Sequence, residues 1–162
     1  MLGIRDKKAW LKPLRGIELF SDCTNRQLAE IDGLMTEVAV PAGTALIREG
    51  RQGREFFIIR EGSAVVTRDG DVIDGLDAGA FFGEVALLDR APRTVSVTAV
   101  TDMRVWVLSR PEFFELLDRM PAVAGRVRRV ADDRRQPSYT TTPRTFFPAA
   151  RSSKASLIPS RG

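Results

Sequence analysis

The sequence predicts a mainly β fold with flanking helices, an α+β protein built around a β-sandwich or barrel. Short apolar runs alternate with turn signals such as Glu61-Gly62 and Asp69-Gly70, a pattern typical of antiparallel strands. Helical periodicity is confined to the two ends of the chain and to one short internal segment. With 162 residues, 43% of them hydrophobic, the chain can form one domain with a single core and a tail.

The elements follow from these patterns in chain order. Short helical turns fit within residues 10–20, and a helix is expected over residues 25–35, where Leu28, Ile31 and Met35 recur at helical spacing. We expect about eight strands, with a helical break at residues 84–89. The strand patterns lie at residues 38–40, 45–47, 56–59, 64–66, 72–73, 94–100 and 104–108.

Two helices are predicted at the carboxyl end of the folded part. Ser109 is a good cap, Pro111 suits a first turn, and Glu112 stands three residues after the cap, as in a capping box. Pro121 interrupts, and a second helix is expected over residues 122–135. The domains are then an N-terminal extension at 1–13, a folded domain at 14–135, and a Ser/Thr/Pro-rich tail at 136–162 that reads as disordered.

The composition excludes several classes of enzyme. The chain has no histidine and one cysteine, Cys23, so Ser-His-Asp and Cys-His chemistry and Cys/His zinc sites are excluded. We therefore expect no catalytic residues, no metal and no cofactor. No apolar run approaches the roughly 18 residues of a membrane span, and no secretory signal is evident, so a cytoplasmic location is expected.

The charge is unevenly distributed along the chain. Residues 126–162 carry nine Lys/Arg and two Asp/Glu, a net charge of +7, against −3 for residues 1–125. Basic tails often contact nucleic acid or acidic surfaces, although a solvated tail explains the same composition.

The segment 81–97 carries the most chemical information. Gly83 permits a tight turn before a short helix, and Arg93 can hold phosphate oxygens in bidentate fashion, assisted by the Thr94 hydroxyl. A carboxylate near an anion would repel it, so Glu84 makes sense facing a sugar hydroxyl, which donates to it. The segment therefore suits a ligand with one anionic phosphate beside a free ribose hydroxyl.

This segment, FGEVALLDRAPRTVSV, resembles the phosphate-binding cassette of the cyclic nucleotide-binding domain. That family includes kinase regulatory subunits, gated channels and catabolite-activator-like regulators. One departure is Val95, where the family usually has alanine. A second run also matches the family, at the expected spacing; its residues are Gly50, Gly53, Phe56, Phe57, Ile58, Ile59 and Gly62.

The resemblance implies an eight-stranded double-stranded β-helix, or jelly roll, with the short phosphate-binding helix inserted in it. It implies that Glu84 holds the ribose 2′-OH and that Arg93 pairs with the cyclic phosphate. The last helix of the family closes over the base, so a lid is expected from Val127, Val130 or a neighbouring arginine. The implied ligand-binding set is Gly83, Glu84, Val85, Ala86, Arg93, Thr94 and Val95, with Val65 and Leu87 beside the sugar and base.

Several alternatives stay open from the sequence. The favoured ligand is cAMP, but Thr94 also suits cGMP. The favoured function is a sensor whose terminal helices move on binding and contact a protein partner or a second copy. A catabolite-activator-type regulator and a trans-acting subunit of a channel, transporter or enzyme compete with it. The tail lacks a recognition-helix pattern, which argues against specific DNA binding but permits non-specific binding. A degenerate domain would instead pair Glu84 with Arg93 and bind nothing.

Overall fold

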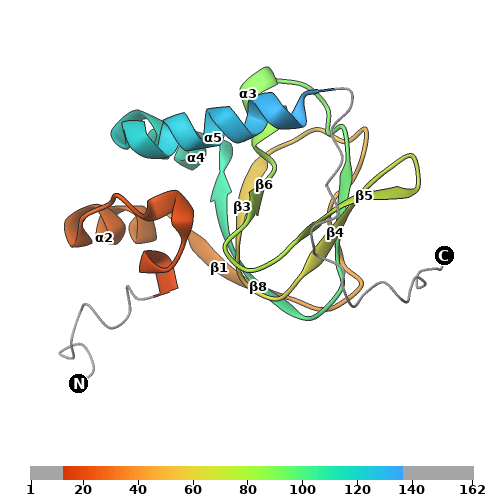
Figure 1. The fold of residues 1–162 in the computed structure, drawn as a ribbon, viewed down its shortest axis with the longest axis horizontal. Coiled ribbons are helices and arrows are strands. Elements are labelled where there is room, and N and C mark those ends of the chain that lie inside the picture. Colours follow the sequence, from red (N-terminus) through yellow and green to blue (C-terminus); the bar gives the residue numbers. More distant parts are fainter. Residues whose placement is uncertain (1–12, 137–162) are drawn as a thin grey trace.

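The computed structural model describes residues 13–136, which form two four-stranded antiparallel sheets with helices packed beside one of them (Figure 1). The first sheet has the order β1-β8-β3-β6 and the second β2-β7-β4-β5. This arrangement confirms the predicted eight-stranded jelly roll with flanking helices. The strands are β1 (Thr36–Val40), β2 (Ala45–Ile47), β3 (Glu55–Glu61), β4 (Ala64–Arg68), β5 (Asp71–Leu76), β6 (Phe81–Phe82), β7 (Ser96–Ala99) and β8 (Met103–Ser109).

Strand β3 lies between two hydrophobic clusters, which explains its uninterrupted apolar sequence. Phe56 and Ile58 belong to the cluster beneath the helices, whereas Phe57 and Ile59 belong to the cluster between the two sheets. Alternate side chains of a strand point to opposite faces, so all four are buried. Strand β8 pairs with β3 in antiparallel register, with Trp106 opposite Ile58. The first sheet therefore forms the wall shared by both clusters.

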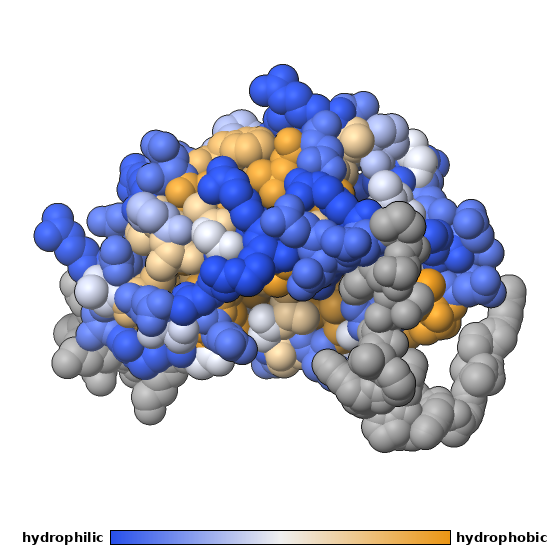
Figure 2. Space-filling view, turned by 45° about the horizontal axis from the view of Figure 1, so that its top comes forward, coloured by the Kyte–Doolittle hydropathy of each residue, from blue (hydrophilic) through white to orange (hydrophobic). Residues whose placement is uncertain are grey.

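The helices begin where the sequence offers caps. Helix α2 (Asn25–Leu34) and helix α4 (Arg110–Arg119) each start with a complete capping box, from Thr24 and Ser109 respectively. A short turn, η2 (Glu18–Phe20), precedes α2, and α5 (Pro121–Arg134) follows α4 directly. In the view of Figure 2, hydrophilic residues cover much of the visible surface and interrupt its apolar areas.

Most strands extend one to three residues beyond the predicted runs, and two larger differences lie around residues 81–97. Strand β6 was not predicted, because its two residues are too few to show an alternating pattern, and it is recognisable only because it pairs with β3. The predicted strand 94–100 is shorter, since β7 covers Ser96–Ala99. The preceding residues, Arg93 to Val95, instead form part of a pocket wall.

The arrangement of the helices positions one end of α5 for function. Helix α5 crosses the top of the molecule in Figure 1, and its last turns lie beside the short helix α3 (Glu84–Asp89). Within residues 13–136, no helix combines the length and apolar character needed to cross a membrane. The predicted tail at 136–162 and most of the predicted extension at 1–13 lie outside the described residues.

Candidate functional site

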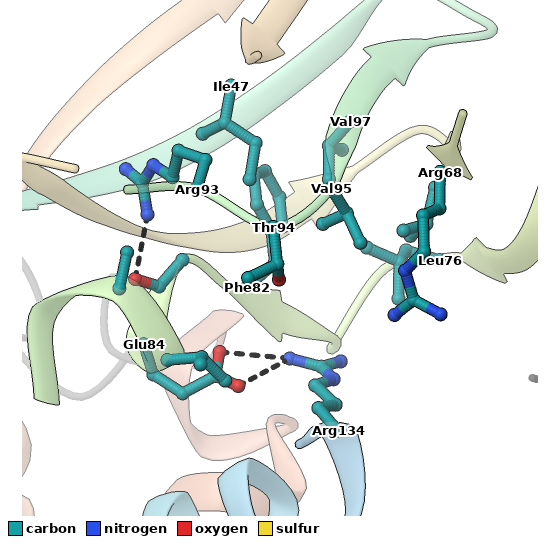
Figure 3. A pocket seen from close by; sticks show the side chains of 14 residues that line it. Ile47, Arg68, Leu76, Phe82, Glu84, Arg93, Thr94, Val95, Val97 and Arg134 are labelled. Atoms are coloured by element: carbon teal, nitrogen blue, oxygen red, sulfur yellow. Dashed lines mark hydrogen bonds and ion pairs between the residues drawn. The ribbon is translucent and has the colours of Figure 1, made fainter. Parts of the chain in front are cut away.

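A pocket opens between the short helix α3, the strands of the second sheet and the end of α5 (Figure 3). It is small, with a volume of about 50 Å³. Seven of the predicted site residues line it, namely Gly83, Glu84, Val85, Ala86, Arg93, Thr94 and Val95. The lining also includes Ile47, Val66, Arg68, Leu76, Phe82, Val97 and Arg134.

Gly83 makes the turn that joins β6 to α3. Its φ of +97° lies in the left-handed region, where side chains are strained. A Cβ at this position would also lie 2.8 Å from the backbone oxygen of Glu55 and 3.1 Å from an Arg93 guanidinium nitrogen. Glycine is therefore required here for two reasons, the backbone conformation and the close approach of Arg93.

Arg93 is fixed by its backbone and its side chain together. Its backbone N–H donates to the carbonyl of Arg51 at 2.8 Å, and its carbonyl accepts from the N–H of Gly50 at 2.8 Å. The guanidinium donates to the carbonyls of Gly83 and Glu55, both at 2.8 Å. These contacts hold the guanidinium in one orientation while its remaining N–H groups stay available to an anion.

The environment of Arg93 favours an anionic ligand. The residue is only 6% exposed, and it forms no ion pair with a described carboxylate. Burial lowers the pKa of its guanidinium below the ordinary value, whereas the nearby carboxylates of Glu55 and Glu84 oppose that effect. A buried cation without a paired anion is costly, and a bound phosphate would remove that cost.

Glu84 lies on the other side of the pocket and pairs with helix α5. Its side chain is 1% exposed, and both carboxylate oxygens accept from Nη1 of Arg134, at 2.9 and 3.1 Å. The same nitrogen donates to the carbonyl of Phe81 at 3.0 Å. The internal Glu84–Arg93 pair of a degenerate domain is therefore absent among the described residues. Figure 3 shows the two groups bonded separately, Arg93 to the carbonyl of Gly83 and Glu84 to Arg134.

The structure places four other predicted residues away from the pocket lining. Val65 projects from β4 on the face opposite Val66, which lines the pocket, because side chains alternate along a strand. Leu87 is fully buried in the cluster beneath the helices. Val127 belongs to that same cluster, and Val130 packs against it. The two valines therefore anchor α5, and its contact with the pocket comes from elsewhere.

That contact is Arg134, which the sequence interpretation covered only as a neighbouring arginine of the lid. Arg134 follows Val130 by four residues and Val127 by seven, so all three lie on one face of α5. Helical spacing from the two valines was the signal that could have identified it. Its partner could not be identified in this way, because Glu84 lies 50 residues earlier in the chain.

Close packing around Gly53 supports a prediction for this site. A Cβ on Gly53 would lie 2.7 Å from the Cβ of Ala86 and 3.0 Å from Cζ of Arg93. Gly53→Ala is expected to destabilise the fold by about 1–3 kcal/mol, because one of these groups must move. Urea unfolding measures the effect. Gly125→Ala in α5 is the control, since a Cβ added there would have no neighbouring atom within 4 Å, and it should stabilise by up to about 1 kcal/mol.

Comparison with known proteins agrees with this geometry. The family model described as "Cyclic nucleotide-binding domain" matches residues 37–120, just over half of the chain. The cAMP-dependent protein kinase regulatory subunit of Yarrowia lipolytica is 37% identical over 106 residues, which cover 64% of this chain and 28% of that protein. The cGMP-dependent protein kinase egl-4 of Caenorhabditis elegans is 34% identical over 103 residues, covering 64% of this chain and 13% of that protein.

A solved structure matches the fold over a larger part of this chain than these sequence relatives do. The structure described as "Sp-2Cl-cAMPS bound to PKAR CBD2" has a TM-score of 0.71 and 27% sequence identity, and the match covers 83% of this chain and 91% of that one. The chain spans less than a third of the length of the two kinase relatives, so the likeness concerns one module of each. The match to the family model, together with the likeness in sequence and fold, shows that the chain belongs to the cyclic nucleotide-binding domain family.

Proposed function

We propose that this chain is a regulatory module that binds a 3′,5′-cyclic nucleotide, with cAMP favoured, in the pocket between α3 and the second sheet. The observation that carries the proposal is Arg93, a buried guanidinium that lines the pocket and forms no ion pair with a described carboxylate. A cyclic phosphate supplies one negative charge and oxygens that suit the guanidinium fork.

The other groups that line the pocket contact different parts of the ligand. Glu84 lies opposite Arg93 and accepts the ribose 2′-OH, since a carboxylate retains acceptor sites beyond those used by Arg134. Thr94 is exposed at the rim and adds a hydroxyl donor beside Arg93. Gly83 and Ala86 bring backbone close to the phosphate, while Val85 and Val95 give apolar contact with the sugar and base.

The base is the least constrained part of the ligand. The relatives include a cAMP-dependent protein kinase regulatory subunit and a cGMP-dependent protein kinase, and the similar solved structure is described as bound to Sp-2Cl-cAMPS. These likenesses support a cyclic nucleotide of either base. The preference for cAMP stays a prediction from the sequence, with cGMP as the alternative.

Helix α5 is the proposed output of the module. Arg134 ties its last turn to Glu84, and the next residue, Arg135, pairs with Asp89 at the end of α3 at 2.8 Å. A ligand that engages Glu84 therefore acts on a residue that also holds α5. Binding shifts the population of α5 positions to the extent that the ligand prefers one of them.

The wider role follows from this module and remains part of the proposal. The proposal includes a non-enzymatic role in the cytoplasm, with a protein partner or a second copy contacting the terminal helices. A relative named as a regulatory subunit supports the regulatory part of it. A transcription regulator or a trans-acting subunit of a channel, transporter or enzyme could use the same module. Specific DNA binding is disfavoured, and a non-specific nucleic-acid role for the tail concerns residues outside the described part.

Calorimetric titration of the full chain with cAMP, cGMP and 5′-AMP tests the proposal. We expect cAMP to bind with a Kd of about 10 μM or below, equivalent to roughly −7 kcal/mol. The linear 5′-AMP should bind at least about tenfold more weakly, because without the 3′,5′ ring its phosphate is not held at a fixed position relative to the ribose 2′-OH. If neither cyclic nucleotide binds at millimolar concentration, the proposed function is wrong. Equal affinity for 5′-AMP would point to a general nucleotide pocket instead.

A further inference from the structure

A second concentration of charge lies beside the nucleotide pocket, around the loop between β2 and β3. Two hollows, of about 230 and 430 Å³, flank this loop and share Gln52 and Arg54 in their walls. Arginines contribute to both walls. We refer to these side chains together as the basic face: Arg48, Arg51, Arg54, Arg90 and Arg110.

The arginines of the basic face differ from most others on the described surface in having no carboxylate partner. Elsewhere, Arg60 pairs with Glu37 at 2.7 Å and Arg119 pairs with Glu115 at 2.6 Å. Among residues 13–136, none of the basic-face arginines forms an ion pair. The guanidinium of Arg110 instead lies over an aromatic ring, with its Cζ 5.2 Å from the centroid of Phe114. No ion pair within the described fold therefore offsets their mutual repulsion.

The acidic residues near this face do not neutralise it. Among the residues that line the two hollows, Glu55 is the one acidic residue, and it lies in the wall of the smaller hollow. The Glu49 carboxylate accepts from the backbone N–H of Asp69, at 3.1 and 3.3 Å. Several positive charges thus surround polar hollows that contain one negative charge, and an anionic group entering them would be attracted.

The basic face is built on the same backbone as the nucleotide site. Arg93 and Ala86 both line the nucleotide pocket. Arg93 also lines the smaller hollow, and Ala86 also lines the larger one. The loop at Gly50 and Arg51 is hydrogen-bonded to the backbone of Arg93 on both sides, at 2.8 Å each. An occupant of the basic face would therefore contact the loop that holds the proposed phosphate-binding arginine.

We propose that the basic face is a docking surface for an acidic, Asp/Glu-rich segment of a partner protein. Carboxylates match the planar guanidinium fork, and two separate hollows suit individual side chains. Single-stranded nucleic acid is less well matched, because it usually also needs exposed aromatic rings for stacking, and no aromatic side chain in residues 13–136 is exposed.

The terminal segments of the sequence given do not supply this occupant. Residues 1–12 contain four Lys/Arg and one Asp, and residues 137–162 contain four Lys/Arg and no Asp or Glu. Both would be repelled by the arginines, so neither of these two segments is the occupant. The inference goes beyond the proposed function and does not depend on nucleotide binding.

Fluorescence anisotropy with the full chain tests it, with a labelled peptide of alternating Glu and Gly as the probe. A peptide of alternating Gln and Gly and a DNA oligonucleotide serve as comparison ligands, each at low and physiological ionic strength. The test variant is R51E/R54E. The matched control is R128E/R129E, which makes the same charge change at two exposed α5 arginines that form no ion pair among the described residues.

We expect the acidic peptide to bind the wild type and to lose at least about tenfold in affinity in R51E/R54E. It should bind R128E/R129E to within about twofold of the wild type. Equal losses in both variants would show that net charge alone attracts the peptide, which overturns the proposal. The proposal is also overturned if the acidic peptide does not bind, or if the Gln peptide binds as tightly as the acidic one. It is overturned as well if the DNA oligonucleotide binds more tightly than the acidic peptide and loses affinity equally in R51E/R54E. Titration of the same variants with cAMP reports separately on the nucleotide pocket.

Discussion

Replacing Arg93 by alanine is expected to weaken cyclic nucleotide binding at least about 100-fold, which corresponds to about 3 kcal/mol. The residue lines the pocket and is buried, and the carbonyls of Gly83 and Glu55 hold its guanidinium in one orientation. Removing it takes away the charge and the bidentate hydrogen bonds offered to the phosphate. Calorimetric titration of the wild type and the variant with cAMP measures the loss.

The truncation also leaves two carbonyls without their donor, so reduced stability has to be separated from reduced affinity. Arg93→Lys keeps the positive charge but loses the planar fork, and it should bind about tenfold more weakly than the wild type. Arg128→Ala, at an exposed position on α5, should change neither the affinity nor the melting temperature. Wild-type affinity in a folded Arg93→Ala variant would contradict the assignment of Arg93 to the phosphate.

Local sequence patterns were sufficient to predict most of the elements and the position of the cassette. The capping box at Ser109 and Glu112 is present as expected, and the strands follow the apolar runs. The cassette could be predicted because its residues are close in the chain. Gly83, Glu84, Arg93 and Thr94 lie within 12 consecutive positions, and all of them line one pocket.

The rest of the pocket depends on packing that a sequence pattern does not encode. The choice between Val65 and Val66 depends on which face of β4 points inward, and both are valines, so periodicity alone cannot decide it. Leu87 lies in the cassette and Val127 lies on α5, but both side chains are fully buried in the hydrophobic core. The Arg134–Glu84 pair depends on how α5 crosses α3, a tertiary contact across 50 residues of chain.

Breaking the Glu84–Arg134 pair is expected to have the largest effect on stability. Arg134→Met would leave a carboxylate that is 1% exposed without its cation. Removing one partner of a fully buried pair costs about 3–5 kcal/mol, and the Arg134 side chain is 18% exposed, so we expect a loss of about 2–3 kcal/mol. Urea unfolding at neutral pH measures the change.

The neighbouring residue provides a matched control. Arg135 pairs with Asp89 at 2.8 Å and with Asp132 at 2.7 Å, and these side chains are more exposed. Hydrogen bonding to Asp89 raises the pKa of the Arg135 guanidinium, which keeps it charged throughout the accessible pH range. Arg135→Met should nevertheless cost no more than about 1 kcal/mol, since solvent and salt screen exposed pairs.

A double-mutant cycle with Glu84→Gln and Arg134→Met then isolates the interaction. If the two side chains act as a pair, the double variant should be more stable than the sum of the single losses predicts, by at least about 1 kcal/mol. Additive losses would show that Glu84 is stabilised by other groups. Because Arg134 orients the carboxylate that we propose accepts the ribose hydroxyl, Arg134→Met should also weaken cAMP binding by about tenfold. Unchanged affinity, with the coupling intact, would limit the pair to holding α5 against α3.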